Sequence, residues 1–310
     1  MIDIPQHSRY AIYCVFALLI IASVTRLWLK YRRPDKDYTE LRQRIQSWWW
    51  MIGILLAMLL ISETVAIAFF GFLSFLALKE FFSIVPTRQA DRRVLFWAYL
   101  SIPVQYYLVA ADWYNMFVVF VPVYVFLLLP MRAVLIGETQ GFTQALGTVH
   151  WGVMLCVFCV SHIAYLMALP VQNIQAGYIG PVLYLLFITQ FNDVCQYVWG
   201  KLLGRHKIIP KVSPKKTWEG FLGGFATVTL VSGFVAPWLT PLSRNEGFVA
   251  GAFMAVAGFI GDVVISSVKR DLRIKDSGTL IPGHGGILDR IDSLIYTAPL
   301  FFHFLRYLHY

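Results

Sequence analysis

The stretch WWWMIGILLAMLLISETVAIAFFGFLSFLAL, residues 48–78, decides the fold class, because apart from Ser74 its only polar residues are Ser62, Glu63 and Thr64. A membrane-spanning helix needs about 20 apolar residues, so this run is long for a single helix. A carboxylate in the middle of a bilayer is costly unless it has a partner or water. We therefore interpret the run as two spans that turn near Glu63. The alternative is one tilted helix with a functional Glu63.

Composition extends this interpretation to the rest of the chain. Hydrophobic residues make up 58% of the sequence and charged residues 14%, and the mean hydropathy is +0.63. Soluble domains contain about 25% charged residues. Eight further apolar runs have lengths near that of a membrane span: residues 11–29, 94–110, 116–129, 148–169, 178–199, 221–239, 247–268 and 293–308. The sequence predicts an all-α, polytopic helical membrane protein with about ten transmembrane helices.

The charged loops predict the orientation of these helices. With the 48–78 run split in two, one set of alternate loops and their flanks holds 23 of the 26 Lys and Arg residues, and the other set holds 3. The positive-inside rule then puts both termini outside and the basic loops in the cytoplasm. These short loops account for the net charge of +9, and loops of this kind attract anionic lipid headgroups, so a nucleic-acid partner is not expected.

Other features indicate one integral membrane domain. The four cysteines lie in apolar runs, so they indicate neither a disulfide framework nor a zinc site. We find no internal repeat or soluble domain in the sequence. Residues 1–189 are expected to supply N-terminal transmembrane helices, and residues 190–310 the C-terminal region that carries the site.

Residues 266–292, SSVKRDLRIKDSGTLIPGHGGILDRID, concentrate the chemistry of the chain. Cations, carboxylates and a glycine-rich centre in one segment are typical of a site that holds phosphates with a divalent metal. Asp262 precedes the segment and shares a helical face with Ser266 and Lys269. Asp289 and Asp292 begin the next helix, three residues apart. The alternative is that these aspartates only cap a helix and pair with nearby cations.

A second basic loop, residues 200–219, reads GKLLGRHKIIPKVSPKKTWE. Its composition alone fits a positive-inside anchor. However, Pro214 breaks the chain, Thr217 can cap a following helix, and Gly223 and Gly224 let another helix pack closely. We therefore regard SPKKTWEG as a candidate phosphate site on the same side of the membrane as the first loop.

The spacing of these residues resembles a known motif. Ser266-x-Val268-Lys269-Arg270, then Lys275-Asp276-x-Gly278, then Ile281-Pro282-x-His284-Gly285-Gly286-Ile287-x-Asp289-Arg290-Ile291-Asp292 is similar to the defining motif of CDP-diacylglycerol synthases, the phosphatidate cytidylyltransferases. SPKKTWEG resembles that family's second motif, and Asn192-Asp193 with Tyr197 its preceding helix. Two positions depart from the pattern: Gln196 replaces a small residue, and Ile265 stands where Glu is common.

The resemblance implies that CTP and phosphatidate react to give CDP-diacylglycerol and pyrophosphate, with Mg²⁺ and possibly a second cation as cofactors. It implies roles for the following residues: Asp262, Asp289 and Asp292 as metal ligands, with Asp193 and Asp276 as second candidates; Ser213, Lys215 and Lys216 on the CTP phosphates; Lys275 in substrate binding; Lys269, Arg270 and Arg290 on the lipid phosphate or pyrophosphate; and His284 on a phosphate or in proton transfer.

The site would face the cytoplasm from a bacterial inner membrane, and the lipid would enter sideways from the bilayer. Three alternatives remain open from the sequence: a catalytically divergent paralogue, an enzyme similar to CTP-dependent polyprenol kinases, and a lipid transporter. A homodimer is also left open.

Overall fold

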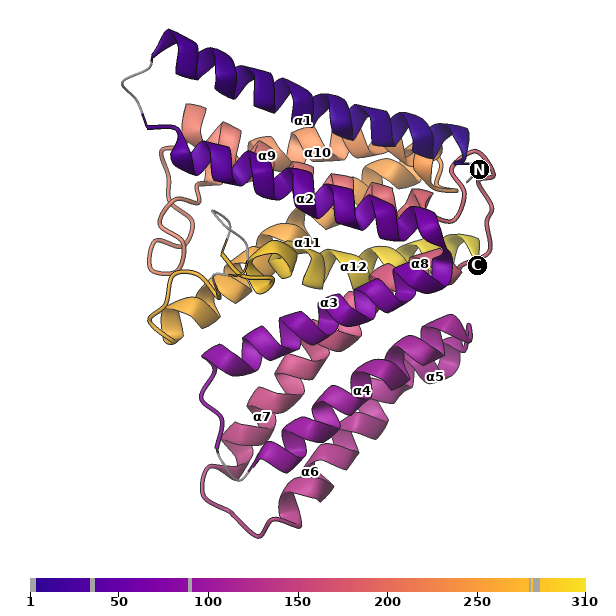
Figure 1. Cartoon of the computed structure of the whole chain (residues 1–310), viewed down its shortest axis with the longest axis vertical. Coiled ribbons are helices and arrows are strands. Elements are labelled where there is room, and N and C mark those ends of the chain that lie inside the picture. The colour runs from indigo at the N-terminus through magenta and orange to yellow at the C-terminus, as the bar shows by residue number, and fades with distance from the viewer. Residues whose placement is uncertain (1–3, 34–36, 89–90, 279, 281–284) are drawn as a thin grey trace.

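The computed structural model describes residues 4–33, 37–88, 91–278, 280 and 285–310, and its regular secondary structure in these residues is helical apart from isolated β-bridge positions, among them the bridge between Lys207 and Thr217. Ten continuous helical segments form the molecule within the described residues (Figure 1). Eight are uninterrupted: α1 (Gln6–Arg32), α2 (Thr39–Ile61), α3 (Glu63–Ile84), α4 (Arg92–Ala110), α9 (Gly180–Leu203), α10 (Trp218–Leu239), α11 (Arg244–Asp271) and α12 (Leu288–His309).

The two remaining segments contain a π-helical turn in the middle. The first comprises α5 (Tyr114–Val119), η2 (Phe120–Val125) and α6 (Phe126–Val134), and the second α7 (Phe142–Val153), η3 (Met154–Cys159) and α8 (Val160–Ala168). Seven of the ten segments are long and apolar enough to cross a membrane. The all-helical membrane class is therefore confirmed, while a full set of ten spans stays a prediction. Helices α4, α9 and α12 fall outside the seven, and α9 and α12 carry charged residues of the predicted site.

The predicted division of the 48–78 run is confirmed. Helix α2 ends at Ile61, and Ser62 adopts an extended conformation before α3 begins at Glu63. The Ser62 hydroxyl oxygen accepts a hydrogen bond of 3.2 Å from the backbone N–H of Val65, which satisfies one free donor at the start of α3. The two helices consequently form an antiparallel hairpin (Figure 1).

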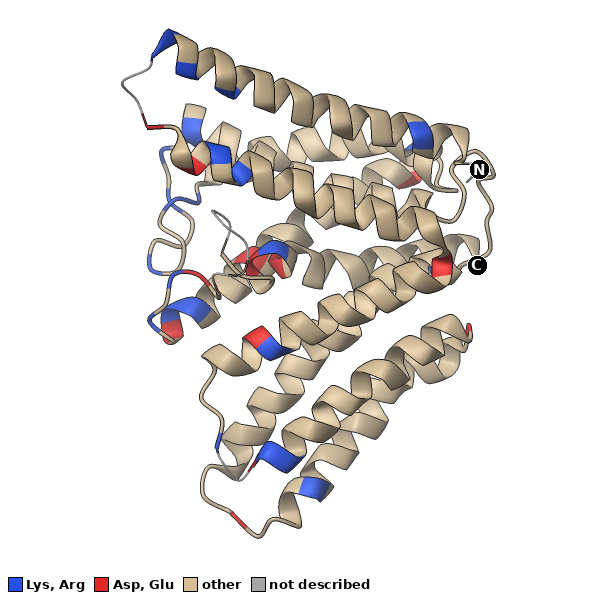
Figure 2. Cartoon of the chain, viewed as in Figure 1, with Lys and Arg blue, Asp and Glu red and all other residues tan. Residues whose placement is uncertain are grey.

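Charge is distributed unevenly along the long direction of the helices. Most Lys and Arg side chains lie toward one end, on the left and lower left of the view, and both chain termini lie at the opposite end (Figure 2). This agrees with the alternation of charge expected from the loops.

Small residues bring the C-terminal helices into close contact. A Cβ atom added to Gly220 would lie 2.7 Å from the carbonyl oxygen of Gln196, so α10 meets α9 backbone to backbone. The predicted close packing at Gly223 and Gly224 is confirmed, since added Cβ atoms there would overlap Trp199 and Gln196 of α9. The expected division at residue 189 falls inside α9, so it marks where the motif residues begin and not the end of a helix.

Candidate active site

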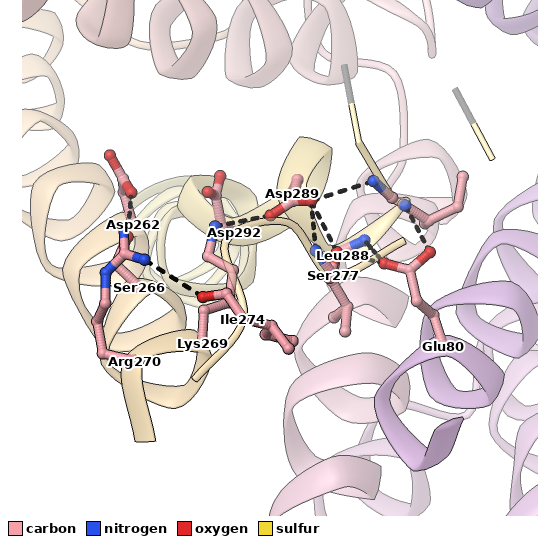
Figure 3. Close-up of polar contacts among 12 residues, drawn as sticks. Glu80, Asp262, Ser266, Lys269, Arg270, Ile274, Ser277, Leu288, Asp289 and Asp292 are labelled. Atoms are coloured by element: carbon pink, nitrogen blue, oxygen red, sulfur yellow. Dashed lines mark hydrogen bonds and ion pairs between the residues drawn. The ribbon is translucent and has the colours of Figure 1, made fainter. Parts of the chain in front are cut away.

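Three carboxylates from three helices gather near the basic end of α11. Asp193 comes from α9, Asp262 from α11 and Asp292 from α12. The negative charges of Asp193 and Asp262 both act on Asp292, so all three lie within electrostatic reach of one another. The carboxylates of Asp262 and Asp292 point the same way from neighbouring helices (Figure 3). A set of like charges in a partly buried place needs compensation by cations.

Gly261 explains how two of these carboxylates come together. A Cβ atom at this position would overlap the backbone carbonyl oxygen of Asp292 and lie 3.2 Å from the Cα atom of Ser293. Helices α11 and α12 can therefore approach this closely only because residue 261 has no side chain. The next residue on α11 is Asp262, so the contact sets its distance from Asp292.

The second basic loop supplies a counter-charge. The Lys216 ammonium lies 2.6 Å from a carboxylate oxygen of Asp262, and the two side chains are 16% and 29% exposed. It also lies 4.6 Å from the centroid of the Phe259 ring, which favours a cation. The Ser266 hydroxyl donates to the other oxygen of Asp262 at 3.1 Å. Residues of both basic segments, Lys216 from 200–219 and Ser266 from 266–292, thus meet at Asp262.

Asp289 has different partners from Asp292, although both lie in the first turns of α12. One of its oxygens is 2.7 Å from the Lys269 ammonium. The other accepts hydrogen bonds from the backbone N–H and the hydroxyl of Ser277, at 2.8 and 2.9 Å, and from the N–H of Gly286 at 3.1 Å. Asp289 therefore holds Ser277 and Gly286 together in this structure, and its role as a metal ligand stays a prediction.

Two arginines of the predicted site differ in how far their donors are satisfied. Arg270 donates to the carbonyl oxygens of Val212 at 3.1 Å and Ile274 at 3.2 Å, which ties the end of α11 to the second loop. The Nε atom of Arg290 is buried and has no hydrogen-bond partner within the described part of the chain. Its charge attracts Asp193. A buried guanidinium donor of this kind is suited to bind an anion.

The second loop is held in shape by Glu219, in the first turn of α10. Its carboxylate accepts hydrogen bonds from the backbone N–H groups of Arg205 and His206, and it contacts the His206 ring at 2.6 Å. The predicted cap at Thr217 is confirmed, because its hydroxyl oxygen accepts from the N–H of Gly220 at 3.2 Å. The loop consequently presents Lys216 in a fixed position.

The remaining residues of the predicted site have no side-chain contact described above with the three carboxylates. Lys215 and Lys275 are exposed, as is Asp276, and Ser213 takes part in the turn that precedes Lys216. His284 lies outside the described residues.

Sequence reasoning missed Glu80 of α3. The apolar run was expected to end at residue 78, whereas α3 continues to Ile84 and carries Glu80 to the glycine-rich segment. A carboxylate directly after an apolar run was the available signal, but nothing in the sequence indicates its partner.

The two departures from the family pattern have structural explanations. Gln196 donates a hydrogen bond of 3.0 Å to the side-chain oxygen of Asn192, and its stem packs where Gly224 leaves room. Ile265 is 2% exposed and belongs to the hydrophobic core. Both departures leave the three carboxylates of the cluster, Asp193, Asp262 and Asp292, in place.

The carboxylate cluster fits Mg²⁺ in its donor chemistry. Among the described residues no three Asp, Glu, His or Cys side chains are grouped closely enough to hold an ion by themselves. Mg²⁺, however, is usually bound through one or two carboxylates together with waters and substrate phosphates. Asp262 and Asp292, whose carboxylates point the same way (Figure 3), supply such a set, and Asp193 lies within electrostatic reach of Asp292.

Comparison with known proteins assigns the family. The model of the cytidylyltransferase family matches residues 42–308. The chain is 43% identical over 296 residues to "Uncharacterized protein YnbB" of Escherichia coli K12, covering 96% of this chain and 97% of that protein. It is 29% identical over 251 residues to the phosphatidate cytidylyltransferase of Staphylococcus haemolyticus, covering 80% and 92%. A match of 39% over 121 residues to the Staphylococcus aureus phosphatidate cytidylyltransferase covers 38% and 46%. The chain belongs to the cytidylyltransferase family of nucleotidyltransferases.

Proposed function

We propose that the protein is a phosphatidate cytidylyltransferase, which converts CTP and phosphatidate to CDP-diacylglycerol and pyrophosphate. The observation that carries this proposal is the ion pair between Lys216 and Asp262, because it joins a cationic loop to a carboxylate cluster at the end of apolar helices. A nucleotide with three phosphates and an anionic lipid would both require such a site. The similarity to a phosphatidate cytidylyltransferase over 92% of that protein's length supports the choice of substrates.

In the proposed reaction, an oxygen of the phosphatidate phosphate attacks the α-phosphorus of CTP. A phosphorus–oxygen bond forms there, the bond from the α-phosphorus to the oxygen of the β-phosphate breaks, and pyrophosphate leaves with the electron pair. The protein would contribute mainly by positioning two anions and stabilising their charge. Lys216 would hold CTP phosphates with Ser213 and Lys215. Arg290, whose buried Nε donor has no partner among the residues that the structure describes, would bind the lipid phosphate or pyrophosphate together with Lys269 and Arg270.

Mg²⁺, when bound, would neutralise phosphate charge. Asp262 and Asp292 are the first candidates to hold it, together with Asp193, whose charge acts on both of them. Asp289 and Asp276 remain further candidates to hold the metal ion. In this proposal the basic end of the helices faces the cytoplasm of a bacterial inner membrane, since positive residues are retained on that side. Phosphatidate would then reach the helix ends sideways from the inner leaflet.

The test uses purified protein in detergent micelles with phosphatidate, Mg²⁺ and CTP labelled in either the α- or the γ-phosphate. We expect label in the lipid phase from α-labelled CTP only. Label from γ-labelled CTP would indicate a lipid kinase, and absence of label from both would refute the proposal.

The variant Asp292→Asn is expected to lose this activity while eluting as a folded protein. Asp37→Asn is the matched control, because Asp37 is exposed and accepts a hydrogen bond only from Thr39 within the described residues. Equal activity of the two variants would contradict the role given to Asp292.

A further inference from the structure

Glu80, on α3 of the N-terminal half, reaches into the segment that carries the motif. Its carboxylate accepts hydrogen bonds from the backbone N–H of Ile287 at 2.8 Å, from the N–H of Leu288 at 3.0 Å and from the Ser277 hydroxyl at 2.5 Å (Figure 3). All three donors are more than 190 residues away in the sequence. The contact therefore ties the N-terminal helices to the candidate active site.

Two of these bonds satisfy the start of α12. The helix begins at Leu288, its N-cap residue is Ile287, and no side chain of the cap position accepts a hydrogen bond there. The first N–H groups of a helix lack partners within the helix, and a negative charge near them is favourable. Glu80 consequently acts as the cap of α12 from another part of the chain.

Glycines leave the space that the Glu80 carboxylate occupies. A Cβ atom added to Gly286 would overlap this carboxylate, and one added to Gly278 would lie 3.0 Å from its Oε2 atom. On the other side of the segment, a Cβ atom at Gly285 would lie 2.5 Å from an oxygen of Asp289. Gly278 and Gly286 thus lie against the Glu80 carboxylate, and Gly285 lies against that of Asp289.

Ser277 connects these two carboxylates. It is 3% exposed, and its hydroxyl lies 2.5 Å from Glu80 and 2.9 Å from Asp289. Because a hydroxyl has one proton, the two acceptors share it. Asp289 in turn lies 2.7 Å from Lys269 of α11. A displacement of Glu80 would therefore be transmitted through Ser277 to Asp289 and Lys269.

We propose that Glu80 is a positioning residue for cytidylyl transfer, which holds Ser277 and the first turn of α12 so that Asp289 and Lys269 face the substrates in the productive arrangement. Its activity readout rests on the proposed function. Among the described residues, the Glu80 carboxylate is bonded to Ser277, Ile287 and Leu288, so we assign it an action through these residues.

The first measurement is independent of activity. In Glu80→Ala, hydrogen exchange of a peptide that contains Ile287 and Leu288 should be faster than in the wild type, by about two amide protons. Glu138→Ala is the control, because Glu138 lies in the loop before α7 and accepts a hydrogen bond from Gln140. Unchanged exchange in Glu80→Ala would overturn the proposal, whether or not the protein uses phosphatidate.

The second measurement separates positioning from a loss of folded protein. Per folded molecule, kcat for CDP-diacylglycerol formation should fall at least tenfold in Glu80→Ala and less in Glu80→Gln, which keeps one acceptor oxygen. The KM for CTP should change less than kcat, since Ser213, Lys215 and Lys216, the residues assigned to CTP binding, lie on the other loop, whereas Lys269 would hold the lipid phosphate or the leaving pyrophosphate. A wild-type kcat with altered KM alone would overturn the positioning role. An inactive wild type would refute the proposed function and leave hydrogen exchange to decide on Glu80.

The third measurement is a double-variant cycle with Gly286→Ala. Alone, this variant should lose activity, because its methyl group would overlap the Glu80 carboxylate. Glu80→Ala removes the obstacle, so the double variant should be no less active than Gly286→Ala. Additive losses would show that the glycine does not make room for Glu80.

Discussion

The substitution Gly261→Ala should impair the enzyme by separating α11 from α12. The added methyl group would overlap the carbonyl oxygen of Asp292 and lie 3.2 and 3.3 Å from two further backbone atoms of α12. Carbon atoms in ordinary contact are about 3.5 to 4.0 Å apart, so the helices must move by several tenths of an ångström or more. Overpacking of this kind costs roughly 1–3 kcal/mol. A misplacement of about 1 Å at a reacting site can reduce the rate about 100-fold.

Gly147→Ala is the matched control, because it also replaces a glycine within a helix, and an added Cβ atom there would meet no atom within 4 Å. Since alanine favours the helix by about 1 kcal/mol over glycine, the control should keep or raise stability. The assay compares kcat and the apparent melting temperature in detergent. We expect both to fall in Gly261→Ala and neither to fall in Gly147→Ala. Wild-type turnover in Gly261→Ala would refute the idea that this contact sets the distance between Asp262 and Asp292.

Three other predictions test the loop, the helix hairpin and the orientation. Lys216→Met should raise the KM for CTP by about 10- to 100-fold, as expected for the loss of a charge-assisted hydrogen bond of roughly 1.5–3 kcal/mol; an unchanged KM would exclude that role. Ser62→Ala should lower stability by roughly 1 kcal/mol through loss of the cap, with kcat unaffected in the folded fraction, and a melting temperature equal to that of the wild type would contradict the cap. In a cysteine-free background, Lys211→Cys should react with a membrane-impermeant thiol reagent only from the cytoplasmic side, and Val171→Cys only from the outside. Both positions are exposed. The reverse pattern of labelling would invert the proposed topology.

The sequence predicted the helices well because each signal is local. The turn at Ser62 follows from one interrupted apolar run, and the close packing at Gly223 and Gly224 follows from adjacent small residues. Contacts between distant helices could not be derived in the same way. The expectation that Asp289 and Asp292 share a role rested on their spacing of three residues. In the folded chain, the backbone N–H groups of Ser277 and Gly286 donate to Asp289, so the two carboxylates have different protein partners, and their shared role stays a prediction.

Glu80 shows why the N-terminal helices cannot be regarded only as a membrane anchor. The recognisable motif lies after residue 190, and glycines occupy several positions of its segment between α11 and α12. Glycines permit close approach but raise the entropy lost on ordering the backbone. Carboxylates on both sides can offset that loss: Asp289 from α12 and Glu80 from α3. The first is part of the motif and the second is not. The arrangement of the site therefore depends on how α3 packs against the C-terminal helices, so substitutions that shift α3 should change turnover even though they lie far from the substrates.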